Sequence, residues 1–120
     1  MRRLLRSPAL FLCSAIAVFA QQTIPAADAA KHLGEKATVC GVVASARYAS
    51  SSKGKPTFLN LDKPYPNAIF TVLIWDDDRA KFNEPEVRLR DKRICTTGKI
   101  TEYRGTPEMV LHEPSQLRVE

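Results

Sequence analysis

The chain has 120 residues, of which 44% are hydrophobic and 26% are charged. This length is enough for one domain with its own core and excludes two. The formal net charge is +5, but three basic residues and no acidic ones lie within residues 1–20. The rest of the chain has fifteen basic and thirteen acidic residues, a net charge of +2. Charge alone therefore does not indicate a nucleic-acid partner.

Residues 1–20 have the three-part pattern of a cleavable secretory signal peptide. A basic start and an apolar run are followed by a small residue that offers a cleavage site before Gln21 (Arg2, Arg3 and Arg6; residues 9–19; Ala20). The apolar run is shorter than the roughly 20 residues that a membrane-spanning helix needs. We therefore expect an exported protein, periplasmic or secreted, with a retained anchor as the alternative.

The cysteines also fit an exported protein. Cys13 lies within the apolar run and is expected to leave with the signal, which leaves Cys40 and Cys95. An even number of cysteines in an oxidising compartment favours one disulfide. The alternative is two separately buried thiols. No metal site is predicted, because these cysteines and the two histidines, His32 and His112, lack the close paired spacing of structural zinc sites.

After a predicted linker at residues 21–24, Pro25 suits the start of a short helix, and Gly34 is placed to end it. The pattern then changes to strands, predicted at residues 37–48, 57–62, 68–75, 92–103 and 108–112. Gly41 and Gly98 lie inside the two long strands, where glycine indicates a bulge or sharp bend. Strongly bent strands favour a closed barrel.

The segments between these strands have turn and helix signals. Residues 49–56 form a polar, glycine-containing loop, and two prolines flank Tyr65 in a predicted turn at 63–67. A short helix is predicted at about 77–82, because Asp76, Asp77 and Asp78 would offset the positive end of a helix dipole. Residues 113–120 are a predicted tail.

Five strands with a helical insertion between the third and fourth is the order of the OB-fold barrel. The chain also resembles a family of small bacterial OB-fold proteins related to the anticodon-binding barrels of aminoacyl-tRNA synthetases. The resemblance extends from Gly34 to Ser115 and depends on the segments TVCGVV (38–43), TFLNL (57–61), FTV (70–72), TGKI (97–100) with Tyr103 and Gly105, and PSQL (114–117). We therefore expect an all-β, five-stranded OB barrel with a short N-terminal helix and a short helix between strands three and four.

The resemblance implies binding of single-stranded nucleic acid or another extended polymer, on the sheet face of strands two and three and the loops that frame it. Such binding needs cations and flat side chains on which bases stack. The candidates are Lys53, Lys55, Phe58, Tyr65, Trp75, Tyr103 and Arg104. Phe58 could instead belong to the core with Phe70, and the lysines could simply be solvated. The same connectivity makes strand one a neighbour of strand four, so that an offset first strand would bring Cys40 opposite Cys95.

No enzymatic activity is predicted, and no cofactor. The three consecutive aspartates lack the alternation of a calcium loop, and Ser50, Ser51 and Ser52 lack the setting of a nucleophile. Some exported nucleases use this barrel, but their metal sites need acids on the strands, and such acids are few here, chiefly Asp62 and Glu108. The remaining alternative is an exported OB module that binds an envelope protein, a glycan or a small ligand.

Overall fold

The computed structural model describes residues 22–120. The predicted signal peptide, its cleavage site and Cys13 lie outside these residues. Within residues 22–120, no helix is both long and apolar enough to cross a membrane.

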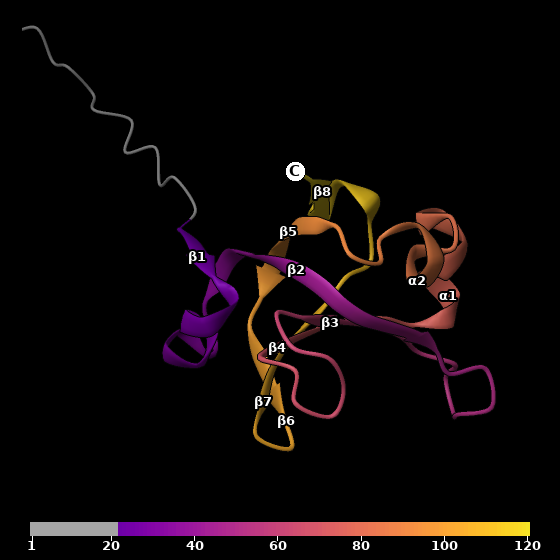
Figure 1. The fold of residues 1–120 in the computed structure, drawn as a ribbon, viewed down its shortest axis with the longest axis horizontal. Helices are drawn as coiled ribbons and strands as arrows, with labels where there is room; N and C mark the ends of the chain where they lie inside the picture. Colours follow the sequence, from indigo (N-terminus) through magenta and orange to yellow (C-terminus); the bar gives the residue numbers. More distant parts are fainter. Residues whose placement is uncertain (1–21) are drawn as a thin grey trace, which may run out of the picture.

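The fold is mostly β, with several short helices (Figure 1). The strands are β1 (Thr23–Pro25), β2 (Lys36–Tyr48), β3 (Thr57–Leu61), β4 (Phe70–Ile74), β5 (Arg93–Lys99), β6 (Thr101–Tyr103), β7 (Thr106–Val110) and β8 (Leu117–Val119). They form one sheet in the order β6-β7-β4-β3-β2-β5-β8, and β1 pairs in parallel with β2. The pairs β1 with β2 and β4 with β7 are parallel, and the other pairs are antiparallel.

The predicted closed barrel of five strands is not confirmed. The hydrogen-bonded order is open, with β6 and β8 at its two ends. The segment 92–103, predicted as one strand, is interrupted at Ile100, whose N–H donates to Glu35 O at 2.9 Å and whose carbonyl accepts from Gly34 N–H at 2.7 Å. Both backbone groups of Ile100 are bonded to Gly34 and Glu35. The predicted strand therefore divides into β5, which pairs with β2, and β6, which pairs with β7.

Both ends of the domain contain strands that the sequence did not predict. The predicted linker at 21–24 supplies two residues to β1, because Ile24 is buried and lies beside Val39 of β2. The predicted tail forms a 3-10 helix, η3 (Pro114–Gln116), and then β8, which pairs with β5. These short segments gain their order from neighbouring strands rather than from their own sequences.

The bend predicted in the first long strand is present. A Cβ built on Gly41 would lie 2.8 Å from Asp62 Oδ1, so only glycine fits here without a shift. Two residues later the register of β2 with β3 changes between Val43 and Ser45, which is a bulge at Ala44. Because of this extra residue, Val43 points into the core while Ser45 points to the opposite side of the sheet.

The helices close the two ends of the core. The predicted N-terminal helix is a 3-10 helix, η1 (Ala26–His32), with Pro25 at its N-cap, and it buries Ala26 and Ala29. Gly34 follows with φ +85°, as expected for a helix-ending glycine. The insertion between β4 and β5 contains α1 (Asp76–Arg79), η2 (Ala80–Phe82) and also α2 (Pro85–Arg88), a second helix that the sequence did not predict. Its Phe82 and Leu89 join the core.

Cys40 and Cys95 form a disulfide, as predicted. The two residues lie directly opposite each other on β2 and β5, with their Cα atoms 4.1 Å apart. Glu120 Oε1 lies 3.2 Å from Cys95 Sγ and is held by Arg118. Cys40, Cys95 and Glu120 are the one close group of metal-ligand side chains found among residues 22–120, and its two sulfur atoms are in the disulfide.

Candidate binding face

The side of β2, β3, β4 and β7 that points away from the core is named here the outer face. Leu59 and Leu61 of β3 and Val72 of β4 are core residues. Since side chains alternate along a strand, the residues between them point outward. The outer face comprises Ser45, Arg47, Phe58, Asn60, Thr71, Leu73, Glu108 and Val110, which the strand registers place side by side.

A row of hydrogen-bonded polar side chains crosses the middle of the outer face. Asn60 Nδ2 donates to Ser45 Oγ at 3.0 Å, and Thr71 Oγ1 donates to Asn60 Oδ1 at 3.1 Å. Glu108 follows Thr71 in the register. Asn60 has its oxygen and nitrogen both engaged, so this row fixes the strands to one another rather than offering free groups.

Glu108 is the carboxyl group on this face, and it is half-buried. Burial raises its pKa above the ordinary glutamate value. No hydrogen bond from another residue of the described part of the chain offsets this desolvation at its side chain. Burial therefore makes the ionised form of this carboxyl group less favourable in the folded domain than in the unfolded chain.

One end of the outer face, named here the Trp75 end, lies where β4 meets the 49–56 loop. Trp75 is 40% exposed, and its ring contacts the loop at Gly54. A pocket of about 300 Å³ lies beside it, lined by Gly54, Lys55, Trp75, Asp76 and Asp77. Lys53 is exposed on the same loop. The structure thus brings three of the predicted site residues into one neighbourhood.

The Trp75 end is supported by polar contacts beneath it. Tyr48 Oη donates to Asp76 Oδ1 at 2.7 Å, and the Arg79 guanidinium lies 3.8 Å from the centre of the Tyr48 ring. Arg79 is also paired with Glu86 of α2. The hydrogen bond to Asp76 raises the pKa of Tyr48, and the Glu86 carboxylate raises the pKa of Arg79. These contacts attach the helical insertion to the end of β2 and so fix the residues that follow Trp75.

The other end, named here the Tyr103 end, is built by the turn between β6 and β7 and by the 62–69 loop. Tyr103 is 58% exposed, and the Arg104 guanidinium lies 5.2 Å from the centre of its ring. Tyr65 is 77% exposed, and its backbone N–H donates to Ser45 Oγ at 3.0 Å, which folds this loop back toward the polar row.

The predicted residues therefore do not form a single cluster. Tyr103 is opposite Thr106, and the register of β7 with β4 places Thr106 level with Ile69, six positions before Trp75. At about 3.3 Å per residue, the two ends are roughly 20 Å apart. Phe58 lies between them, half-buried beside Leu73, whereas Phe70 is fully buried in the core.

The sequence did not predict several residues of the site. These are Arg47, the two aspartates of the pocket, and the polar row of Ser45, Asn60 and Thr71. The alternation of TFLNL would have indicated that Phe58 and Asn60 share a face. The position of Ser45 has no such signal, because it depends on the bulge at Ala44.

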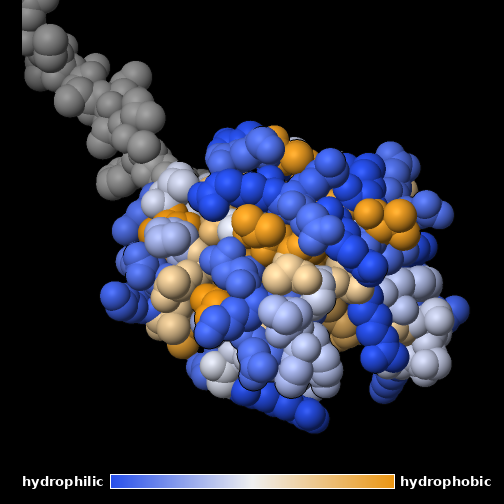
Figure 2. Space-filling model, in the orientation of Figure 1, coloured by the Kyte–Doolittle hydropathy of each residue, from blue (hydrophilic) through white to orange (hydrophobic). Residues whose placement is uncertain are grey.

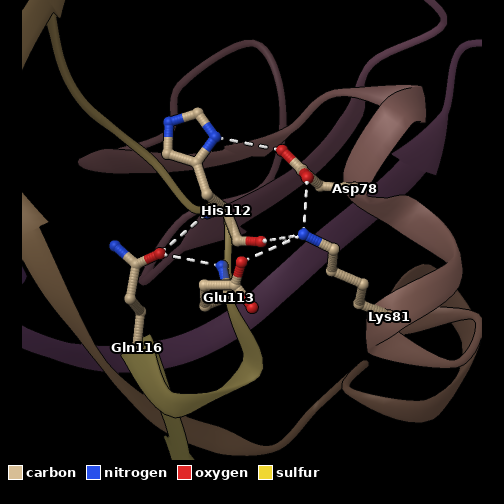
Figure 3. A network of polar contacts seen from close by, with 5 residues as sticks. All are labelled: Asp78, Lys81, His112, Glu113 and Gln116. Atoms are coloured by element: carbon tan, nitrogen blue, oxygen red, sulfur yellow. Dashed lines mark hydrogen bonds and ion pairs between the residues drawn. The ribbon is translucent and has the colours of Figure 1, made fainter.

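A separate polar network holds the helical insertion to the end of β7 (Figure 3). Lys81 Nζ donates to Asp78, to Glu113 and to the carbonyl of His112, and His112 Nδ1 lies 3.0 Å from Asp78 Oδ2. His112 and then Lys81 lower the pKa of Asp78, while Glu113 and Asp78 raise the pKa of Lys81. Gln116 Oε1 accepts from the backbone N–H groups of His112 and Glu113. All five residues are engaged with one another, so the network is an anchor.

The surface seen in Figure 2 is mostly hydrophilic, and its hydrophobic residues lie in small separate patches. A broad apolar patch is the usual mark of a protein-docking or membrane-docking surface. No broad apolar patch is visible among residues 22–120 on this side of the molecule.

No family model matches the chain, and no curated protein matches it. Several solved structures share its fold, among them the following two. A protein described as a putative aspartyl-tRNA synthetase from Leishmania major Friedlin aligns over 88% of this chain with a TM-score of 0.58 and 9% identity. OBody AM1L10, solved bound to hen egg-white lysozyme, aligns over 87% of this chain and 98% of its own, with a TM-score of 0.55 and 16% identity. The chain covers 22% of the synthetase, about a fifth of its length. At these identities the likeness is one of fold alone.

Proposed function

We propose that this chain is an exported OB-type binding module whose outer face binds single-stranded nucleic acid without catalysis. The proposal includes a secretory signal at residues 1–20 and a closed or nearly closed five-stranded barrel. In that barrel β2, β3, β4 and β7 are four of the strands, and β5 with β6 together make the fifth. A single residue, Ile100, separates β5 from β6, which supports treating them as one strand. This combined strand pairs with β2 through β5 and with β7 through β6.

The observation that carries the proposal is the pairing of exposed aromatic rings with cations at both ends of one sheet face. Trp75 lies with Lys55, and Tyr103 lies with Arg104. Flat rings accept nucleobases of any sequence, and cations beside them neutralise the phosphates between the bases.

The cations of this face are available to neutralise phosphates. Within residues 22–120, no acidic side chain forms an ion pair with Arg47, Lys53, Lys55 or Arg104. A net charge near +2 is compatible with a local cationic track of this kind, because affinity depends on where the charges lie.

A salt titration of oligonucleotide binding tests the proposal. The full chain is expressed, the purified product is mixed with labelled single strands of about 12 nucleotides, of DNA and of RNA, and fluorescence anisotropy is followed. We expect binding at low salt and a log–log slope of about −0.7 for each phosphate that is neutralised. Absence of binding to every oligonucleotide at low salt would falsify the proposed function.

A further inference from the structure

The pocket beside Trp75 differs in charge from the rest of the outer face. Its lining residues include two acids, Asp76 and Asp77, but one base, Lys55. A nucleic-acid strand that passed through it would bring its phosphates close to these carboxylates, which repel them. The pocket is therefore suited to a part of the strand that has hydroxyl groups and lacks a phosphate.

The pocket is formed before any ligand arrives. Asp76 N–H donates to Gly54 O at 3.2 Å, which ties the 49–56 loop to the start of α1. A Cβ on Gly54 would lie 2.8 Å from Trp75 Cζ3, so the loop backbone packs directly against the indole. These contacts hold Trp75 in place while 40% of its surface remains exposed. Part of the indole is therefore open to a ligand while the loop holds the rest of it.

The two carboxylates are able to accept hydrogen bonds. Asp76 keeps its orientation through the bond that Tyr48 Oη donates to Oδ1 at 2.7 Å. Asp77 is exposed and has neither a hydrogen bond nor an ion pair from its side chain to any residue in 22–120. Carboxylates accept hydrogen bonds and donate none when ionised, so they favour a ligand that presents donors such as hydroxyl groups.

An internal nucleotide has a phosphate on each side of its sugar. The 3′-terminal ribonucleoside of an RNA with a free end instead presents two neighbouring hydroxyls, the 2′- and 3′-OH, and has a phosphate only on its 5′ side. Two acidic residues are available as acceptors for this diol, the indole for the base, and Lys55 for the preceding phosphate.

We propose that the Trp75 pocket binds the 3′-terminal ribonucleoside of single-stranded RNA, with the base on Trp75 and the 2′,3′-diol against Asp76 and Asp77. This inference rests on the proposed function and adds to it a ligand class, RNA over DNA, and a direction for the strand on the face. The other sugar that offers hydroxyls to an aromatic ring, a pyranose of a glycan, is an outcome of the test.

Three RNAs of one sequence, ending in a free diol, a 3′-phosphate or a 2′,3′-dideoxynucleoside, test the inference on the full chain. Trp75 is the single tryptophan of the sequence, so its fluorescence reports directly on the pocket. We expect the 3′-phosphate to weaken binding about tenfold, through repulsion from the carboxylates. We expect the dideoxy end to weaken it by about threefold to tenfold, because it cannot form the hydrogen bonds of the diol.

Asp77→Asn separates charge repulsion from shape. It removes one negative charge at an exposed position and should reduce the phosphate penalty to about threefold or less. Asp28→Asn is the matched control, because Asp28 lies in η1, on the opposite side of the molecule from the 49–56 loop (Figure 1), and it should keep the full penalty.

Each outcome decides the matter. Equal binding of the three RNAs overturns the pocket assignment and leaves the proposed function standing. Quenching of Trp75 by methyl pyranosides, with no preference among the RNA ends, overturns it in favour of a glycan site. If no RNA or DNA binds at all, both proposals fail. The RNA series on the unmodified chain is informative even if Asp77→Asn does not fold.

Discussion

The carboxylate of Asp62 occupies the space that a side chain at Gly41 would need. A Cβ at position 41 would lie 2.8 Å from Asp62 Oδ1 and 3.3 Å from Ala26 Cβ, while Asp62 Oδ1 itself accepts the Val42 N–H at 2.9 Å. The bend of β2 thus depends on Gly41 within β2 and on the carboxylate of Asp62, which follows β3.

Replacing Gly41 by Ala should therefore destabilise the domain by about 1–3 kcal/mol, the usual cost of overpacking, as measured by urea denaturation. If the carboxylate causes most of this cost, the same change should cost less in an Asp62→Gly background, where φ of +68° suits glycine. An equal cost in both backgrounds would show that the backbone and Ala26 dominate instead.

The disulfide between Cys40 and Cys95 should stabilise the native state by restricting the unfolded chain. The two residues are separated by 55 positions. A loop of this length corresponds to roughly 4 kcal/mol in the chain-entropy estimate, and measured values are often lower. The double variant Cys40→Ala/Cys95→Ala should accordingly lower the free energy of unfolding by about 2–4 kcal/mol. An unchanged denaturation midpoint in this variant would contradict the expectation.

Glu108 should make the domain less stable as the pH rises. Burial raises its folded-state pKa. Between the unfolded and the folded pKa the native state binds more protons, so stability declines as pH increases through this interval and stays lower above it. Glu108→Gln should remove this decline and raise the melting temperature at neutral pH relative to the unmodified chain. A lower melting temperature for the variant at neutral pH would mean that the ionised carboxylate has a favourable partner.

Tyr103 should contribute to oligonucleotide affinity through stacking. Its ring is 58% exposed at a turn and supports no core contact, so Tyr103→Ala should fold normally and weaken binding by about 1–3 kcal/mol. Val87→Ala, at an exposed position on α2, is the control and should leave the affinity unchanged. Equal affinity of the Tyr103 variant and the unmodified chain would remove the Tyr103 end from the binding face.

Lys53 and Lys55 should act through charge. Replacing both by Ala should flatten the log–log salt dependence by about 0.7 for each phosphate that is no longer neutralised. Lys31→Ala removes a cation from η1 and should leave the slope as it is, since Lys31 is paired with Asp28. A slope that changes as much in the Lys31 variant would indicate a diffuse effect of net charge.

The sequence allowed the long strands and the disulfide to be predicted, because their signals are local: apolar runs with internal glycines and an even number of cysteines. The division at Ile100 was not predictable. The apolar pattern continues through this residue, and what ends the strand is a hydrogen bond to Glu35, 65 positions earlier. Strand β8 was missed because the three residues Leu117–Val119 have no pattern of their own and become a strand by pairing with β5.

For the candidate site, the exposed rings were predictable and their arrangement was not. Trp75 and Tyr103 lie at the ends of predicted strands, and both are exposed. Their separation depends on the parallel pairing of β4 with β7, which joins segments far apart in the chain. The polar row escaped prediction because Asn60 and Thr71 each lie within a strand that appears apolar, and the direction of Ser45 depends on a bulge.

The distance between the Trp75 end and the Tyr103 end makes the outer face sensitive to the length of its ligand. A fragment that reaches one end gains that end's contacts alone. Once an oligonucleotide is long enough to span roughly 20 Å, its attachment at one end of the face holds the rest of it at a high effective concentration near the other end. Avidity of this kind produces a threshold, so a proposed nucleic-acid ligand would be discriminated by its length before its sequence is read.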